Sequence, residues 1–263
     1  MQNVEAKRRT GGAAQIEIED LRFILTAVRG SILPCPRILS KKERQRKTAI
    51  KTYKPPTVAE YCEDADLADL VTLAAGAGQR PSQLLGLEWP DIDLTAKTLR
   101  TTGKIVRIPG KGLVRQVIEN DPKNPGGTIA LPDFAIEVLK RRKVALAARR
   151  LASPADPDRD DVNVTLVFPS TEWTPRDPSN VQGEWRRARE ALGLPDDVTL
   201  YSFRKAVATI LDDAGLSARV TADVLQHADP AMTQRKYMAR GRVHHEAAAA
   251  LDRAVGGDET LGD

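Results

Sequence analysis

Residues 200–238 read LYSFRKAVATILDDAGLSARVTADVLQHADPAMTQRKYM, and this stretch indicates the class of fold to expect. Apolar residues recur in it every three or four positions, which is the spacing of one face of an α-helix. The pattern predicts three short helices, over 202–214, 217–226 and 230–239, and an Ala-rich run predicts another over 243–255. This part of the chain therefore predicts a mainly α-helical domain.

The preceding part of the chain predicts further short helices. Thr57-Val-Ala-Glu60 has the pattern of a capping box, in which side chains and backbone at a helix start bond reciprocally. We expect Asp66 to cap an apolar helix that ends at Gly76–Gly78, because Asp favours helix starts and Gly favours helix ends. Pro81 suits the first turn of the next helix, where an N–H has no partner within the helix.

Between these helical regions, residues 91–131 alternate β-prone runs with Gly, Pro and Asn. Such runs predict a small antiparallel sheet, with strands near 98–100, 105–108, 113–118 and 128–131. Beyond the sheet, the spacing predicts helices from Pro132 through Leu146 and over 178–192, and one short strand at Leu166–Phe168. The predicted fold class is α+β, mainly α-helical, with the small sheet near the N-terminal side of the domain.

The front of the chain differs from the rest in charge. Residues 1–56 hold thirteen Lys and Arg against five Asp and Glu, whereas the remainder of this +4 chain is net acidic. They contain a predicted amphipathic helix at 17–29 and a basic linker at 36–54, which is followed by a proline pair typical of a boundary. We expect three parts: a basic segment 1–56, a domain over 57–255 and a flexible acidic tail over 256–263. The basic front fits a polyanionic partner and, equally, a solvated tail.

Composition sets further limits. Hydrophobic residues make up 41% and charged residues 29% of the 263 residues, which is ordinary for a globular protein. No apolar run approaches the roughly 20 residues that cross a membrane, and the basic N-terminus lacks the apolar stretch of a signal peptide. Cys35 and Cys62 have no metal-ligand spacing, so we expect free thiols in a reducing cytoplasm.

Four polar residues stand beside apolar, structured segments: Arg80, Arg204, His227 and Tyr237. Each alone is ordinary, since most arginines lie on surfaces and most tyrosines fill cores. Their order and the motifs around them resemble the tyrosine recombinase (phage integrase) family. Those motifs are AGQRPSQLLGLEWPDID, FPSTEWTPRDPSNV, LYSFRKAVATILDDAG and VLQHADPAMTQRKYM. The resemblance covers residues 57–255, nearly all of that family's catalytic domain.

The resemblance assigns Arg80 and Arg204 to the two catalytic arginines, His227 to the Leu-Gly-His motif and Tyr237 to the nucleophile. Attack on a phosphodiester concentrates negative charge on its non-bridging oxygens, which guanidiniums bind and stabilise at any working pH. A phenol, with an ordinary pKa of about 10, needs nearby cations or a base such as His227 to attack. The resulting 3′-phosphotyrosine stores the bond energy, so we expect no cofactor and no metal.

Five further positions match or depart from the family pattern. Lys123 matches the hairpin lysine that protonates the leaving 5′-oxygen, and Lys111 is the next candidate; either lysine would otherwise be a solvated hairpin tip. Tyr201 stands where the family has the histidine of its His-x-x-Arg box, and a phenol bonds phosphate but is a poorer base. Gln83 replaces an acidic residue and loses a charge that would orient its neighbours. Gln226 replaces glycine, which is tolerable at a helix end.

The resemblance also implies partners. These are double-stranded DNA at recombination sites, further copies of the chain in a homo-tetramer, and accessory DNA-bending proteins, in a bacterial cytoplasm. The helix at 243–255 would dock into a neighbouring protomer or pack on its own core, and the pattern leaves both open. The helix at 17–29 and the basic linker resemble the end of the family's core-binding domain, most of which is not seen in this sequence.

Three functions are consistent with this sequence. The leading one is a site-specific recombinase, and the alternatives are a catalytically silent DNA-binding module of the same fold and a type IB topoisomerase-like relaxing enzyme. Asp91 and Asp93 resemble a nuclease carboxylate pair, but their spacing favours residues that flank a turn. The run His244-His245-Glu246 is expected on the surface, because adjacent side chains on a helix point about 100° apart.

Overall fold

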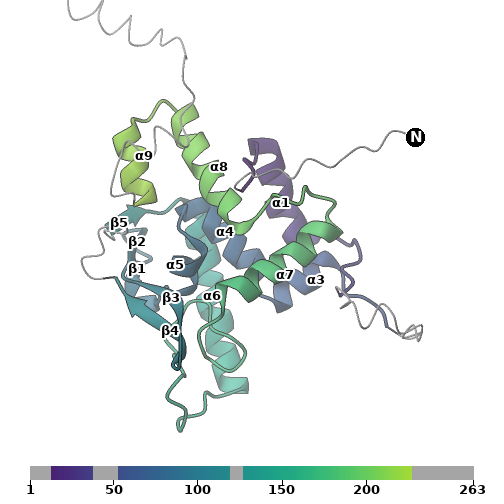
Figure 1. Ribbon diagram of the computed structural model, residues 1–263, viewed down its shortest axis with the longest axis vertical. Coiled ribbons are helices and arrows are strands. Elements are labelled where there is room, and N and C mark those ends of the chain that lie inside the picture. The colour runs from purple at the N-terminus through teal and green to yellow at the C-terminus, as the bar shows by residue number, and fades with distance from the viewer. Residues whose placement is uncertain (1–12, 38–52, 119–126, 227–263) are drawn as a thin grey trace, which may run out of the picture.

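The structure of the protein is a computed structural model that describes residues 13–37, 53–118 and 127–226 (Figure 1). The helices of this part are α1 (Ile18–Gly30), α3 (Val58–Asp64), α4 (Leu67–Ala77), α5 (Pro81–Leu85), α6 (Asp133–Ala152), α7 (Pro178–Ala191), α8 (Leu200–Asp213) and α9 (Ala218–Leu225). Its strands are β1 (Ile92–Asp93), β2 (Thr98–Thr101), β3 (Gly103–Ile108), β4 (Gly112–Val117) and β5 (Gly127–Ala130), and a 3-10 turn precedes β1. The predicted α+β, mainly helical class is confirmed. The helices predicted over 230–239 and 243–255, and the acidic tail, lie outside the described residues.

The helices begin and end close to the predicted residues. One predicted capping interaction, at the start of α4, is not formed. At α3, Thr57 N–H donates to Glu60 Oε2 over 2.7 Å and Glu60 N–H donates to Thr57 Oγ1 over 3.2 Å, which confirms the capping box. The capping role predicted for Asp66 is wrong. Its backbone is left-handed, with φ 56°, and its side chain makes no capping bond to α4. The carboxylate binds Arg142 instead, a partner that only the tertiary fold brings near.

The strands form two separate antiparallel groups, which corrects the prediction of a single sheet. β2 lies between β1 and β5, with Leu99 opposite both Ile92 and Ile129, while β3 and β4 form their own hairpin. The hairpin leaves the sheet because β3 packs on the end of α5. There Gly86 touches the backbone of Lys104 so closely that an added Cβ would lie 2.8 Å from Lys104 Cα.

The segment Leu166–Phe168 is buried but is not the strand predicted. It forms a single bridge, between Glu88 and Leu166, and Val167 N–H donates to Leu87 O over 2.9 Å. All three of its side chains are fully buried. The apolar run therefore reflects burial in the core and not strand pairing, two states that a short apolar sequence does not distinguish.

Helix α4 lies at the centre of the fold, with α1, α6 and α8 in contact with it (Figure 1). Trp185 of α7 meets Phe203 of α8 edge to face, with ring centroids 5.4 Å apart, and donates Nε1–H to Val198 O. Ile24 and Val28 of α1 are fully buried in the same core as α4. The division of the chain at residue 56 stays a prediction, and α1 packs with the elements that follow that point.

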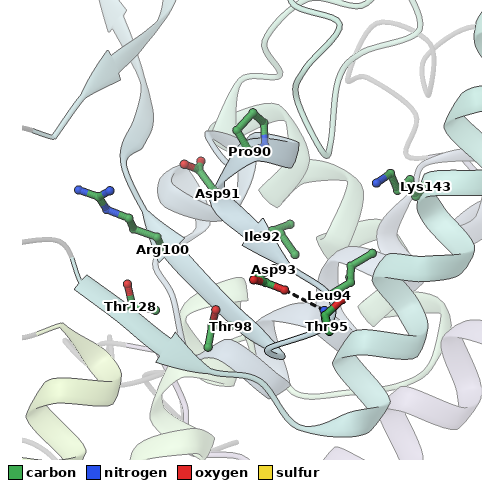
Figure 2. A pocket seen from close by; sticks show the side chains of 10 residues that line it. All are labelled: Pro90, Asp91, Ile92, Asp93, Leu94, Thr95, Thr98, Arg100, Thr128 and Lys143. Carbon is green, nitrogen blue, oxygen red and sulfur yellow. Dashed lines mark hydrogen bonds between the residues drawn. The ribbon is translucent and has the colours of Figure 1, made fainter.

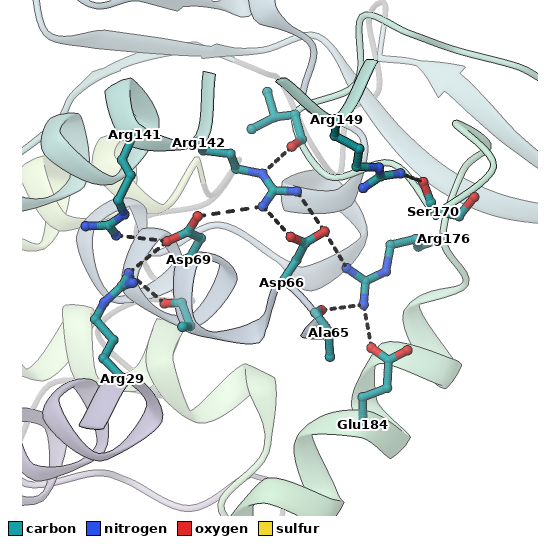
Figure 3. Close-up of polar contacts among 12 residues, drawn as sticks. Arg29, Ala65, Asp66, Asp69, Arg141, Arg142, Arg149, Ser170, Arg176 and Glu184 are labelled. Carbon is teal, nitrogen blue, oxygen red and sulfur yellow. Dashed lines mark hydrogen bonds and ion pairs between the residues drawn. The ribbon is translucent and has the colours of Figure 1, made fainter. Parts of the chain in front are cut away.

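A network of arginines and carboxylates joins several of the helices (Figure 3). Arg142 of α6 is 2% exposed and binds the two oxygens of Asp66 at 2.8 and 2.9 Å. Arg29 of α1 and Arg141 of α6 bind Asp69 of α4 at 2.9 and 3.0 Å. Ion pairs thus connect α1, α4 and α6.

The network continues to α7 through Arg176, which binds Glu184 at 2.5 Å and lies 3.8 Å from Asp66 (Figure 3). Burial of Asp66 opposes its ionisation, but the hydrogen bonds and charge of Arg142, with the charge of Arg176, outweigh burial. Together they hold the pKa of Asp66 below its ordinary value. The ionised carboxylate therefore links the start of α4 to α6 and, through Arg176, to α7.

Candidate functional site

The site is built around Arg204, in the first turns of α8. This residue is 2% exposed, and its Nη1 donates to Gly78 O over 2.7 Å while its Nη2 donates to Leu225 O over 2.5 Å. Because the N–H donors of a guanidinium lie in one plane, these two bonds orient the group. Both of these acceptors are main-chain carbonyls. Arg204 thereby joins the end of α4 to the end of α9.

The turn between α4 and α5 carries Arg80. It begins at Gly78, whose backbone is left-handed with φ 63° and so close to α9 that an added Cβ would lie 2.8 Å from Leu225 Cδ2. Arg80 is the N-cap of α5, and its N–H donates to Gln83 Oε1 over 3.1 Å. The amide that replaces an acid in the family pattern therefore holds the backbone of Arg80. The turn places Arg80 two residues from a carbonyl that Arg204 binds.

Two buried glutamines add further bonds between the same segments. Gln79, which is 1% exposed, donates to Val224 O over 3.3 Å, and Thr101 Oγ1 lies 3.5 Å from its Oε1. Gln226, which is 3% exposed, donates to Gly127 O over 3.0 Å. Sequence reasoning missed Gln79 and treated Gln226 only as a tolerable replacement. The available signal was a polar side chain, inside an apolar motif, next to a candidate catalytic residue.

The structure brings part of the predicted catalytic set together. Arg80 lies in the turn whose Gly78 carbonyl Arg204 binds, and Tyr201 lies on α8 one helical turn before Arg204, with 49% of its surface exposed. Lys111 is exposed in the turn between β3 and β4. Three predicted residues lie outside the described part of the chain, and their roles stay predictions: Lys123, His227 and Tyr237.

Asp91 and Asp93 hold turns, as predicted. Asp91 is buried and accepts hydrogen bonds from Thr102 Oγ1 at 2.6 Å and from Arg115 at 3.2 Å. Asp93 accepts from the backbone N–H groups of Thr95 and Ala96, in the turn that follows β1. Both line an open pocket of about 630 Å³ beside the three-stranded sheet, which contains none of the predicted catalytic residues (Figure 2). The pair has the contacts of structural carboxylates.

The described residues hold no group of three or more His, Cys, Asp or Glu side chains placed to bind a metal ion. Within the same ranges, no helix is both long enough and apolar enough to cross a membrane. Cys35 and Cys62 are free and buried, and burial raises the pKa of the Cys62 thiol to about 12. The run 244–246 lies outside the ranges that the structure covers.

The fold is that of a tyrosine recombinase catalytic domain. The Tn1549 transposon integrase, solved in complex with a circular intermediate DNA, matches with a TM-score of 0.67 at 17% identity, over 94% of this chain and 67% of that one. The crystal structure of XerA recombinase matches with a TM-score of 0.50 at 19% identity, over 83% of this chain and 65% of that one. Residues 42–242 match the model of the Phage integrase family, and the chain belongs to that family.

Curated relatives are tyrosine recombinases. The chain is 27% identical over 204 residues to the tyrosine recombinase XerC-like protein of Caldanaerobacter subterraneus subsp. tengcongensis, covering 74% of this chain and 52% of that protein. It is 28% identical over 167 residues to tyrosine recombinase XerC of Mesorhizobium japonicum, covering 64% of this chain and 45% of that protein. The chain therefore spans about half the length of these relatives. The resemblance drawn from the sequence motifs is confirmed.

Proposed function

We propose that this protein is a site-specific DNA recombinase that cleaves and rejoins double-stranded DNA through a 3′-phosphotyrosyl intermediate, as in phage integration and excision. The observation that carries the proposal is the pair of bonds made by Arg204. They join the turn that presents Arg80 to the helix end that directly precedes His227. A buried guanidinium oriented in this way fits a role in binding a phosphate whose negative charge grows during reaction.

The proposed reaction uses each residue in one role. Arg80 and Arg204 bind the non-bridging oxygens of the scissile phosphate. The phenol oxygen of Tyr237 attacks phosphorus and passes its proton to His227, the bond from phosphorus to the 5′-oxygen breaks, and Lys123 donates a proton to that oxygen. Rejoining reverses these steps with a different 5′-hydroxyl. The hydroxyl of Tyr201, a residue that is half exposed, adds a hydrogen bond to phosphate.

A trapped covalent adduct tests the proposal. The protein is mixed with nicked duplexes of randomised sequence, from which the short strand beyond the cleaved bond diffuses away so that rejoining cannot occur. We expect a protein–DNA adduct that survives denaturing electrophoresis and is absent with Tyr237→Phe. An adduct that persists in this variant removes Tyr237 as the nucleophile.

The same preparation separates the alternatives. Salt-dependent DNA binding without any adduct would indicate a silent DNA-binding module. Relaxation of supercoiled plasmids regardless of sequence would indicate a topoisomerase-like enzyme. Site-specific recombination instead requires that the adduct form on a restricted set of sequences, which sequencing of the trapped DNA reveals.

The assembly that we propose is a tetramer on DNA, formed in a bacterial cytoplasm and assisted by DNA-bending proteins. The predicted helix at 243–255 would dock into a neighbouring protomer. Removing residues 243–263 should then reduce the DNA-bound species from four copies to fewer, as measured by light scattering of the complexes. An unchanged tetramer would contradict the docking role.

A further inference from the structure

The three-stranded sheet has one face in the core and one face in an open pocket (Figure 2). Leu99 and Ile129 point into the core and are 0% and 5% exposed. Successive side chains on a strand point to opposite faces, so Arg100 of β2 and Thr128 of β5, which lie opposite each other, belong to the outer face. Both are exposed and line the pocket. The outer face is therefore polar and open to solvent.

The charge on this outer face changes from one end to the other. Arg100 lies near the end where β2 leaves the sheet, whereas Asp93 lies at the other end, opposite Thr98. The carboxylate of Asp93 already accepts two backbone N–H groups. Within the described ranges, Arg100 makes no hydrogen bond and no ion pair (Figure 2). Its N–H donors are therefore available to an anion from outside the sheet.

The end of β2 that carries Arg100 is also the end that touches the candidate site. Thr101 follows Arg100 and points to the opposite face, where its Oγ1 lies 3.5 Å from Oε1 of Gln79. Gln79 is buried and directly precedes Arg80. One residue on each side thus separates the outer-face arginine from the first candidate catalytic arginine.

The start of β5 reaches the site by a second route. Gly127, which directly precedes Thr128, accepts a hydrogen bond from Gln226 Nε2 over 3.0 Å. Gln226 follows Leu225, whose carbonyl accepts from Arg204 over 2.5 Å. These contacts hold the two strand ends beside both candidate arginines, and all of them lie among the described residues.

We propose that Arg100, together with the hydroxyl of Thr128, binds a DNA backbone phosphate that flanks the scissile phosphate. The inference rests on the proposed function, because the two candidate catalytic arginines are what would bring DNA to this end of the sheet. A guanidinium binds phosphate through charge-assisted hydrogen bonds, and a threonine hydroxyl can donate another. The carboxylate of Asp93 repels phosphate, which confines the contact to the end near the site.

A contact of this kind positions the duplex and reads no sequence. Arg100 and Thr128 would fix how DNA lies across the site, while other groups select the target. The contact would therefore contribute to affinity in a way that depends on salt, because each phosphate that a protein binds releases counterions.

The salt dependence of binding tests the contact. Affinity is measured at several salt concentrations for an intact duplex, with a sequence recovered from the trapped adducts. Arg100→Gln should bind about 10-fold more weakly at low salt, and the slope of log affinity against log salt should become smaller by about 0.9. Arg100→Lys keeps the charge and should restore the slope. Thr128→Val should weaken binding about three-fold and leave the slope unchanged, because it removes a hydroxyl and no charge.

Lys143→Gln is the matched control. Lys143 lines the same pocket from α6, on the side away from Arg100, with its Nζ 5.7 Å from the centre of the Trp89 ring (Figure 2). The substitution changes the net charge as Arg100→Gln does, so a wild-type slope is expected if direct contact decides the effect. Urea unfolding of Arg100→Gln should match the wild type, because the side chain has no partner among the described residues.

Neutral methylphosphonates, placed one at a time beside the cleaved bond, locate the phosphate. At the contacted position the wild type and Lys143→Gln should each lose about 10-fold in affinity. Arg100→Gln should lose no more than about two-fold there, because its contact is already missing.

A wild-type slope for Arg100→Gln, an equal change of slope in Lys143→Gln, or no position coupled to Arg100 would each overturn the inference. In these cases the Tyr237-dependent adduct remains and the proposed function stands. Absence of that adduct with the wild type would remove the proposed function, and this inference with it.

Discussion

Two regions of the molecule are built around a buried arginine, and the hydrogen bonds that hold the guanidinium differ between them. In the ion network, Arg142 faces the carboxylate of Asp66 at 2.8 and 2.9 Å, so opposite charges are matched. At the candidate site, Arg204 donates to two main-chain carbonyls, at 2.7 and 2.5 Å. Both residues are 2% exposed. Arg142 thus binds a carboxylate that belongs to the ion network, whereas the two carbonyl bonds of Arg204 orient its guanidinium between the ends of α4 and α9.

The comparison separates stability from catalysis. Removing one partner of a buried ion pair leaves the other charge uncompensated and destabilises the fold. Replacing an arginine that stabilises a transition state lowers the reaction rate even when the fold survives. The same substitution in the two regions should therefore have different consequences.

The largest expected effect follows from Arg204→Lys. One ammonium cannot bond both Gly78 O and Leu225 O in the plane of a guanidinium, nor bind phosphate with two parallel bonds. The rate of adduct formation should fall about 10²- to 10³-fold. Arg142→Lys makes the same change in the ion network and should lower the unfolding midpoint without altering the rate per folded molecule. Equal loss of rate in both variants would erase the proposed difference between the regions.

Acid should weaken the ion network at its carboxylate. The pKa of Asp66 is lower in the folded protein than in the unfolded chain, so its contribution is present above the unfolded value of about 3.9 and is lost as pH falls through the folded value. Asp66→Asn should cost roughly 3 kcal/mol of unfolding free energy at pH 7. Urea unfolding at several pH values should show this difference shrinking below about pH 4. A difference that is constant down to pH 2 would show that ionisation of Asp66 does not stabilise the fold.

A smaller effect is expected at the turn between α4 and α5. Gly78→Ala should lower the unfolding free energy by about 2 kcal/mol, from a strained φ together with contacts to Leu225 and Val207. Gly110→Ala is the control, because Gly110 has φ +76° and no atom within 4 Å of an added Cβ. It should cost about 1 kcal/mol, from backbone strain alone. Equal losses in urea unfolding would show that close packing at Gly78 contributes nothing.

The smallest effect is expected from Tyr201→Phe. If the hydroxyl makes one hydrogen bond to phosphate, its loss should slow adduct formation about five- to ten-fold. Tyr61→Phe is the matched control, because its hydroxyl lies on α3 and donates to Glu184 O at 3.4 Å. The control should leave the rate unchanged. A 10²-fold or greater loss in Tyr201→Phe would indicate instead that the phenol takes part in proton transfer.

Local sequence features predicted the helices and several of their ends. Three helix ends depend on residues within one turn: the capping box at Thr57, the glycine that ends α4 and the proline that begins α5. Such short-range signals can be read from the sequence alone. The motifs around Arg80 and Arg204 are likewise continuous in the sequence, and they were enough to identify the family.

Contacts between distant segments were decided only by the tertiary structure. The carboxylate of Asp66 binds Arg142 and does not cap its own helix. The β3–β4 hairpin is separate from the three-stranded sheet and packs on α5. Leu166–Phe168 is buried and forms a single bridge in place of a strand. The two glutamines belong to this group as well, since Gln226 bonds to Gly127, which lies 99 residues earlier in the sequence. A buried polar group must find a partner, but which partner it finds depends on packing, and short-range sequence patterns do not contain that information.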